Sequence, residues 1–102
     1  MRVVDSTGFV FGEIDSLPGC SQIAISHAVF CAPEARNCGF GNQAHKERLK
    51  LLKKLGYDFA LCTVDLSNKH QISILEEHDW DLLAEFDSSK TGHEVGIYGK
   101  QL

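Results

Sequence analysis

An arginine and two glycines stand close together in the segment "ARNCGFGNQA", at Arg36, Gly39 and Gly41. The residues that follow have the spacing of a helix. A helix N-terminus offers unpaired backbone N–H groups and the positive end of the helix dipole, and glycines let the chain approach a bound group closely. These residue types at this spacing indicate a site for a phosphate or pyrophosphate group.

Two familiar phosphate-binding motifs fit this segment less well. A Walker-type loop needs a lysine and a hydroxyl residue after its last glycine, whereas Gly41 is followed by Asn42 and Gln43. The letters "GFGNQA" do satisfy the dinucleotide pattern G-x-G-x-x-A, with Asp65 at the end of the next strand. In that fold, however, the glycines follow the strand directly, and here residues 33–38 intervene. The dinucleotide interpretation is therefore the weaker one.

Several segments have the composition of strands. "MRVVDSTGFVFGEID" predicts a hairpin that turns at residues 6–8, and "QIAISHAVFCA" over 22–32 is rich in β-branched and aromatic residues. Strict alternation in the second segment predicts His27 and Val29 on one face and Ser26 and Phe30 on the other. Pro33 ends that strand because it has no N–H for the ladder. Further strands are predicted over 58–66, 81–87 and 94–102, and the last two form a closing hairpin.

Two segments have helical periodicity. Residues 42–55 place one group of side chains on a common side, and Gly56 predicts the end of this helix. The members of that group are Ala44, Arg48, Leu51, Leu52 and Leu55. A second helix is predicted from a capping pair at Asn68 and Gln71 to about His78.

The predicted element order is strand, strand, strand, helix, strand, helix, strand, strand. Such an order predicts an α/β (α+β) fold with a mixed, mostly antiparallel sheet and two helices. The chain of 102 residues is expected to form one domain, residues 1–102.

Composition narrows the possible partners and location. A net charge of −4 argues against a surface built for nucleic acid, although the basic run over 45–54 could attract a small anion or simply form a solvated helix face. No apolar run is long enough to cross a membrane and no signal peptide is recognisable, so we expect a cytoplasmic protein with no membrane partner. The four cysteines form no CxxC pair and the histidines are scattered, so no metal site is expected.

The stretch "VFCAPEARNCGFG" resembles the signature of the GNAT superfamily of acetyl-CoA-dependent N-acetyltransferases. That signature is R/Q-x-x-G-x-G/A, entered from a strand that ends in a proline-containing turn. Downstream, Asn68 and Trp80 stand at spacings that are similar to those of the family's asparagine and G-F pair, and the closing hairpin agrees as well. The resemblance covers the whole chain, and it implies a short member that begins after the family's usual first strand and two helices.

The resemblance implies acetyl-CoA as the cofactor and assigns residues to it. Its pyrophosphate would lie on the segment that consists of Arg36, Asn37, Cys38, Gly39, Phe40, Gly41 and Asn42. Lys46 or Lys69 would lie near the remaining phosphate. The pantetheine arm would follow Val29, Phe30 and Cys31, with Asn68 on its other side. The backbone N–H of Cys31 would polarise the thioester carbonyl.

The family's chemistry is direct attack of an amine on the thioester, which requires a base and a proton donor for the leaving thiolate. His27 stands where histone-acetylating members carry a glutamate base, and Glu13 is a weaker candidate for that role. Leu75 occupies the position of the tyrosine acid of many members. The resemblance therefore implies an N-acetyltransferase that acts on a small-molecule or protein amine. Either the second copy in a homodimer supplies the missing wall of the site, or the acceptor is a large surface that needs little enclosure. A non-catalytic acetyl-CoA-binding regulatory module and an adaptor that kept only the fold are the alternatives.

Overall fold

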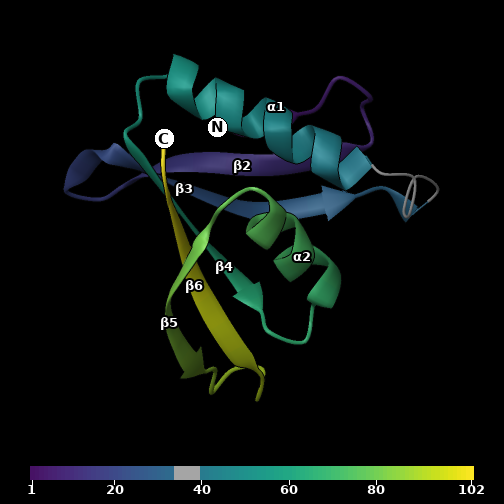
Figure 1. Ribbon diagram of the computed structural model, residues 1–102, viewed down its shortest axis with the longest axis vertical. Helices are drawn as coiled ribbons and strands as arrows, with labels where there is room; N and C mark the ends of the chain where they lie inside the picture. The colour runs from purple at the N-terminus through teal and green to yellow at the C-terminus, as the bar shows by residue number, and fades with distance from the viewer. Residues whose placement is uncertain (34–39) are drawn as a thin grey trace.

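The computed structural model describes residues 1–33 and 40–102, and its element order is the predicted one (Figure 1). The helices are α1 (Phe40–Lys54) and α2 (Lys69–Glu77). The described strands are β1 (Arg2–Val4), β2 (Val10–Leu17), β3 (Cys20–Cys31), β4 (Phe59–Asp65), β5 (Asp81–Asp87) and β6 (Glu94–Gln101). None of the helices in this part of the chain is long and apolar enough to cross a membrane.

The strands form one mixed sheet in the order β1-β2-β3-β4-β6-β5. Every neighbouring pair is antiparallel except β3 and β4, which run parallel. The mixed, mostly antiparallel sheet that the sequence predicts is therefore confirmed. The parallel pair is short, because register is kept only from Ile23 opposite Phe59 to Ile25 opposite Leu61. Beyond Ile25 the two strands separate, as Figure 1 shows, and leave a gap in the sheet.

Both helices pack on one face of the sheet. Leu52 of α1 and Leu75 of α2 are the largest fully buried side chains, and they belong to one core cluster with Ala24 and Ala60 of the two parallel strands. Trp80, just after α2, donates a hydrogen bond from Nε1 to Nε2 of His45 on α1 at 2.8 Å. The helices therefore lie side by side over the gap between β3 and β4.

Local signals fix the helix ends. Gly56 adopts a φ of 89° after α1, where its N–H donates to the Lys53 carbonyl and the Tyr57 N–H donates to the Leu52 carbonyl. This is the pair of bonds with which a left-handed glycine closes a helix. At the start of α2, the Asn68 side chain accepts a hydrogen bond from the Gln71 N–H at 3.2 Å, so the predicted cap is confirmed.

The predicted alternation in β3 is wrong after His27. His27 lies opposite Glu13 and Phe30 lies opposite Phe11, so three steps along β3 match two along β2. This extra residue is a β-bulge, which exchanges the two faces of the strand. Phe30 consequently stacks on Phe11 on the face away from the helices, with ring centroids 6.0 Å apart. Val29 turns to the helix side instead of sharing a face with His27.

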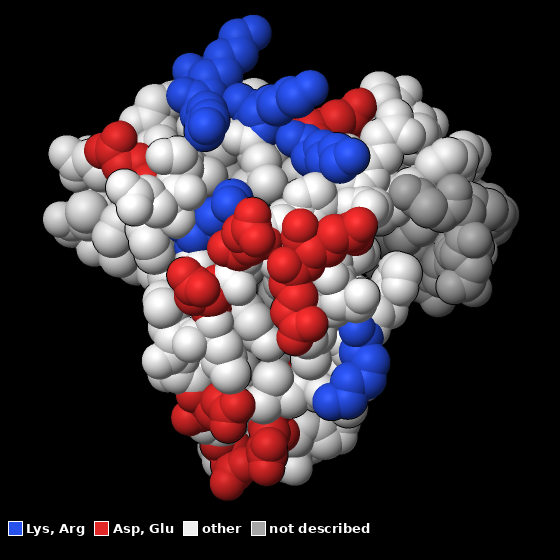
Figure 2. All heavy atoms as spheres, viewed as in Figure 1, with Lys and Arg blue, Asp and Glu red and all other residues white. Residues whose placement is uncertain are grey.

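Positive and negative side chains gather in different parts of one face of the molecule. Figure 2 shows lysine and arginine side chains gathered over α1, whose last turn carries Lys53 and Lys54. Acidic side chains gather below them, over the region of α2 and the lower end of the sheet. The basic surface therefore belongs to the helix that follows the predicted phosphate-binding segment.

Candidate active site

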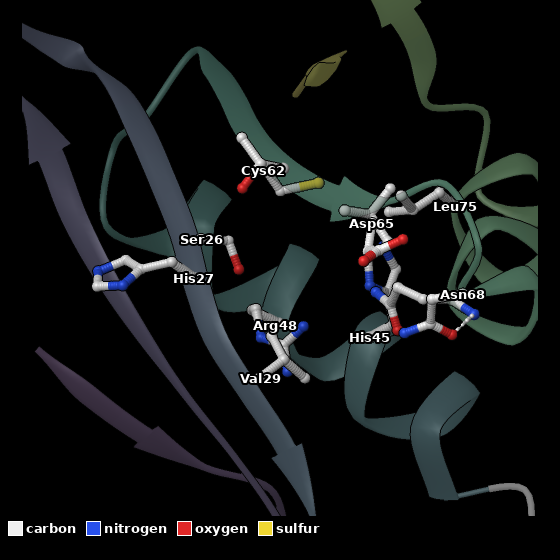
Figure 3. A pocket seen from close by; sticks show the side chains of 12 residues that line it. Ser26, His27, Val29, His45, Arg48, Cys62, Asp65, Asn68 and Leu75 are labelled. Carbon is white, nitrogen blue, oxygen red and sulfur yellow. Dashed lines mark hydrogen bonds between the residues drawn. The ribbon is translucent and has the colours of Figure 1, made fainter. Parts of the chain in front are cut away.

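A cavity of about 200 Å³ lies where β3 and β4 separate. Ser26 and Val29 border it from β3, and Cys62 borders it from β4. His45 and Arg48 reach it from α1 (Figure 3). The cavity also extends to Asn68 at the start of α2. All four elements that meet at the gap in the sheet therefore contribute to one hollow.

At Cys31 the backbone N–H of β3 points toward this gap. Val10 lies opposite Cys31, but its N–H donates to Oδ1 of Asp5 at 3.2 Å and its carbonyl accepts from the Asp5 N–H at 3.0 Å. Opposed residues of an antiparallel pair either bond to each other or both point away. The N–H of Cys31 is therefore directed to the other edge of β3, which faces β4. This is the orientation that the predicted role of Cys31 requires.

His27 borders the cavity, yet its ring lies on the other face of the sheet. Figure 3 shows the imidazole on the opposite side of β3 from Ser26. Its Nε2 lies 2.7 Å from Oδ2 of Asp15 and 3.9 Å from Oε2 of Glu13, and 42% of the side chain is exposed. The hydrogen bond with His27, followed by the Met1 amine, holds the pKa of Asp15 below its usual range. His27 thus has a carboxylate partner and open access from solvent.

Glu13, Asp15 and His27 also bring their ligand atoms within 4.8 Å of one another, close enough for a metal ion. The sequence did not predict this group, because neither carboxylate lies near His27 along the chain. The antiparallel register of β2 and β3 brings the three side chains together. The single hydrogen bond at 2.7 Å between His27 and Asp15 is the geometry of an oriented base.

Three residues of the predicted pyrophosphate segment lie at the start of α1, and each has a packing contact. Phe40 stacks on Phe9 with ring centroids 5.7 Å apart. A Cβ on Gly41 would lie 3.3 Å from Cδ1 of Ile74, so the absence of a side chain lets α1 approach α2 closely. Asn42 donates to Oε2 of Glu77 at 3.2 Å and hydrogen-bonds His78. Arg36, Asn37, Cys38 and Gly39 lie outside the described residues.

Asn68 lies at the cavity and also caps α2 through its Oδ1. This cap gives the asparagine a structural role that is independent of any cofactor. Leu75 is 1% exposed and borders the same cavity with an apolar side chain. Neither tyrosine replaces the missing hydroxyl, because Tyr98 is buried in the core and Tyr57 bonds to Ser16 at 2.8 Å.

Two buried polar residues of α1 were not predicted as part of a site. Arg48 is 8% exposed and His45 is 4% exposed. Burial, together with the nearby Arg48 and His78, lowers the pKa of His45 to about 3. Burial raises the pKa of the Cys62 thiol to about 12. A signal for Arg48 was present in the sequence, since a charged residue stands among the apolar positions of the helix.

No protein-family profile matches the sequence, and no curated protein does. Solved structures do match it. The ribosomal-protein-S18-alanine N-acetyltransferase from Escherichia coli has a TM-score of 0.80 and 13% sequence identity, with 99% of this chain and 68% of that chain covered. A GCN5-related N-acetyltransferase from Kribbella flavida has a TM-score of 0.80 and 16% identity, with 97% and 64% covered.

The structure of yncA from Salmonella typhimurium with its cofactor acetyl-CoA also matches, with a TM-score of 0.80 and 14% identity. The match covers 92% of this chain and 58% of that chain. The chain thus spans about three fifths to two thirds of the length of these structures. Acetyltransferases of the GNAT family from Streptococcus pneumoniae and Desulfovibrio desulfuricans match over 91% and 97% of this chain. The chain therefore has the fold of the GNAT acetyltransferases.

Proposed function

We propose that this chain is an N-acetyltransferase that moves the acetyl group of acetyl-CoA to an amine by direct attack. The supporting observation is the gap between β3 and β4, with a cavity under the helices and the His27–Asp15 pair on the opposite face. A thioester that lay in this gap would be accessible to an amine from the His27 side. The acyl donor would therefore reach the gap from the helix side of the sheet, and the amine would reach it from the opposite face.

The reaction needs three groups from the chain. His27 takes a proton from the attacking ammonium or amine, and Asp15 holds the imidazole in position through its hydrogen bond. The N–H of Cys31 stabilises the negative charge that develops on the thioester oxygen. The new C–N bond forms as the C–S bond breaks, and water protonates the departing thiolate because Leu75 offers no proton.

Cofactor binding would use the cavity and the N-terminus of α1. The pantetheine arm would follow the backbone of Val29, Phe30 and Cys31 and pass Asn68 on α2. The pyrophosphate would lie at the N-terminus of α1, on residues 36–42, where helix geometry favours anions. Lys46, in the second turn of α1, would add favourable charge near that end.

The direct test is release of free thiol from acetyl-CoA in the presence of a panel of amines, with the acetylated product identified by mass spectrometry. We expect His27→Gln to bind acetyl-CoA as the unmodified protein does and to lose roughly a hundredfold or more in kcat. The matched control is Asp87→Asn on the edge strand β5, which should turn over normally. Equal rates for His27→Gln and the unmodified protein would remove His27 from the mechanism.

A second function is favoured by one observation, the buried Leu75 at the cavity. Without a proton donor at this position, the chain could bind acetyl-CoA as a regulatory module and transfer nothing. Binding of acetyl-CoA with no thiol release for any amine is the result that this alternative predicts. An adaptor that kept only the fold would show no binding at all. The homodimer and the cytoplasmic location expected from the sequence stay predictions.

A further inference from the structure

Arg48 is a buried cation without an ion-pair partner in the part of the chain that the structure describes. Only 8% of the residue is exposed, and its Nε has no hydrogen-bond partner among these residues. The ion pairs of the described residues do not include it. A buried charge without a partner is costly, so its presence in a small domain needs a reason.

No described group forms an ion pair with Arg48. Burial holds the Cys62 thiol in its neutral form, with the pKa raised to about 12. The carboxylate of Asp5 attracts the guanidinium only from beyond ion-pair distance, and it accepts hydrogen bonds from the Thr7 hydroxyl and the Val10 N–H. Glu47 on α1 accepts hydrogen bonds from the Ser6 hydroxyl and N–H. The guanidinium retains its charge under these conditions, because arginine is protonated throughout the physiological range.

The absence of a side chain at Gly12 leaves room for the guanidinium over β2, beside Val29 of β3. A Cβ on Gly12 of β2 would lie 3.5 Å from Nη2 of Arg48 and 3.5 Å from Cγ2 of Val29. Arg48 and Val29 therefore meet over the same point of the sheet, and both line the cavity in Figure 3. Val29 is two residues before Cys31, whose N–H points to the gap. The charge thus lies close to the place where the acyl group of a bound thioester would extend.

We propose that the acyl group for which this cavity is built ends in a carboxylate, as in malonyl-CoA or succinyl-CoA. The inference rests on the proposed function and changes only the acyl group. The planar guanidinium would receive the free carboxylate in the cavity with two parallel hydrogen bonds. That carboxylate takes no part in the reaction, in which the amine nitrogen bonds to the thioester carbon and coenzyme A leaves as before. Acetyl-CoA is then the weaker donor.

The test compares binding of coenzyme A, acetyl-CoA, butyryl-CoA and succinyl-CoA to the unmodified protein by calorimetry. Butyryl and succinyl groups have the same number of carbon atoms, so the pair isolates the terminal carboxylate. We expect succinyl-CoA to bind at least about tenfold more tightly than butyryl-CoA, and Arg48→Gln to remove this difference. Lys50→Gln, on the same helix, is the matched control and should retain it.

The outcomes separate this inference from the proposed function. If no coenzyme A derivative binds, the proposed function fails and the inference fails with it. If coenzyme A and acetyl-CoA bind but succinyl-CoA binds no better than butyryl-CoA, only the assignment of Arg48 is overturned. The ratio of the succinyl-CoA and butyryl-CoA affinities of the unmodified protein decides this even if Arg48→Gln does not fold. Arg48→Met provides a second variant of similar length.

Discussion

Nε2 of His27 on β3 lies 2.7 Å from Oδ2 of Asp15 on β2, so this hydrogen bond joins the side chains of two paired strands. The pair lies on the face of the sheet that the two helices leave open. It joins a residue that the sequence predicts as a base to a residue that the sequence did not single out. A histidine oriented by a carboxylate is a frequent arrangement for proton transfer.

Asp15→Asn tests whether this hydrogen bond positions the base. We expect kcat to fall by about tenfold, less than for removal of His27, because the imidazole remains but is poorly oriented. The KM for the acyl donor should not change, since Asp15 lies on the acceptor face. Asp15→Glu should recover part of the rate, and Asp87→Asn is the matched control. A rate for Asp15→Asn equal to that of the unmodified protein would leave His27 without a positioning partner.

Metal removal tests whether Glu13, Asp15 and His27 bind a metal ion. Glu13, Asp15 and His27 could hold a cation, but the proposed chemistry assigns His27 to proton transfer. We expect dialysis against EDTA to leave thiol release unchanged, and added Zn²⁺ to inhibit by occupying the imidazole. Loss of activity with EDTA and recovery with Zn²⁺ would instead make these three side chains a metal centre.

His45 makes folding sensitive to acid. Burial lowers its pKa from 6.5 to about 3, so the unfolded chain binds a proton more readily than the folded chain. This contribution to stability is fully present above pH 6.5 and is lost as the pH falls from there toward 3. Between pH 7 and pH 5 we expect a loss of about 2 kcal/mol in the free energy of unfolding, measured by urea denaturation.

A matched pair of variants isolates that effect. His45→Gln keeps an acceptor for the Trp80 Nε1–H and cannot titrate, so it should flatten the pH dependence. His70→Gln, on the exposed side of α2, should retain the dependence of the unmodified protein. Identical slopes for the two variants would mean that another group controls acid stability.

Most of the fold could be predicted from local patterns. Gly56 ends α1 and Asn68 caps α2 because the signals for both lie within a few residues of the helix ends. The order of the elements follows from the same kind of information. The faces of β3 after His27 could not be predicted, because a bulge depends on how the strand pairs with β2.

The site could be predicted only in part. Gly41 was assigned to phosphate binding, and the structure adds a packing reason, its approach to Ile74. Asp15 was missed because its partner is twelve residues away and register alone brings them together. The sequence places Arg48 on the inner side of its helix, but only the fold shows that it is buried without an ion-pair partner among the described residues.

The central claim is that the start of α1 and the gap beside β3 bind coenzyme A. The most direct measurement is calorimetric titration of the unmodified protein with acetyl-CoA, together with the variant Gly39→Val/Gly41→Val. Gly41→Ala is the control for packing, because it adds only the Cβ that would approach Ile74. We predict saturable heat with one site per chain, and weaker binding by the valine variant. Ligand at one hundred times its Kd should also add about 2.7 kcal/mol of stability. No heat and no stabilisation at saturating acetyl-CoA would contradict the claim.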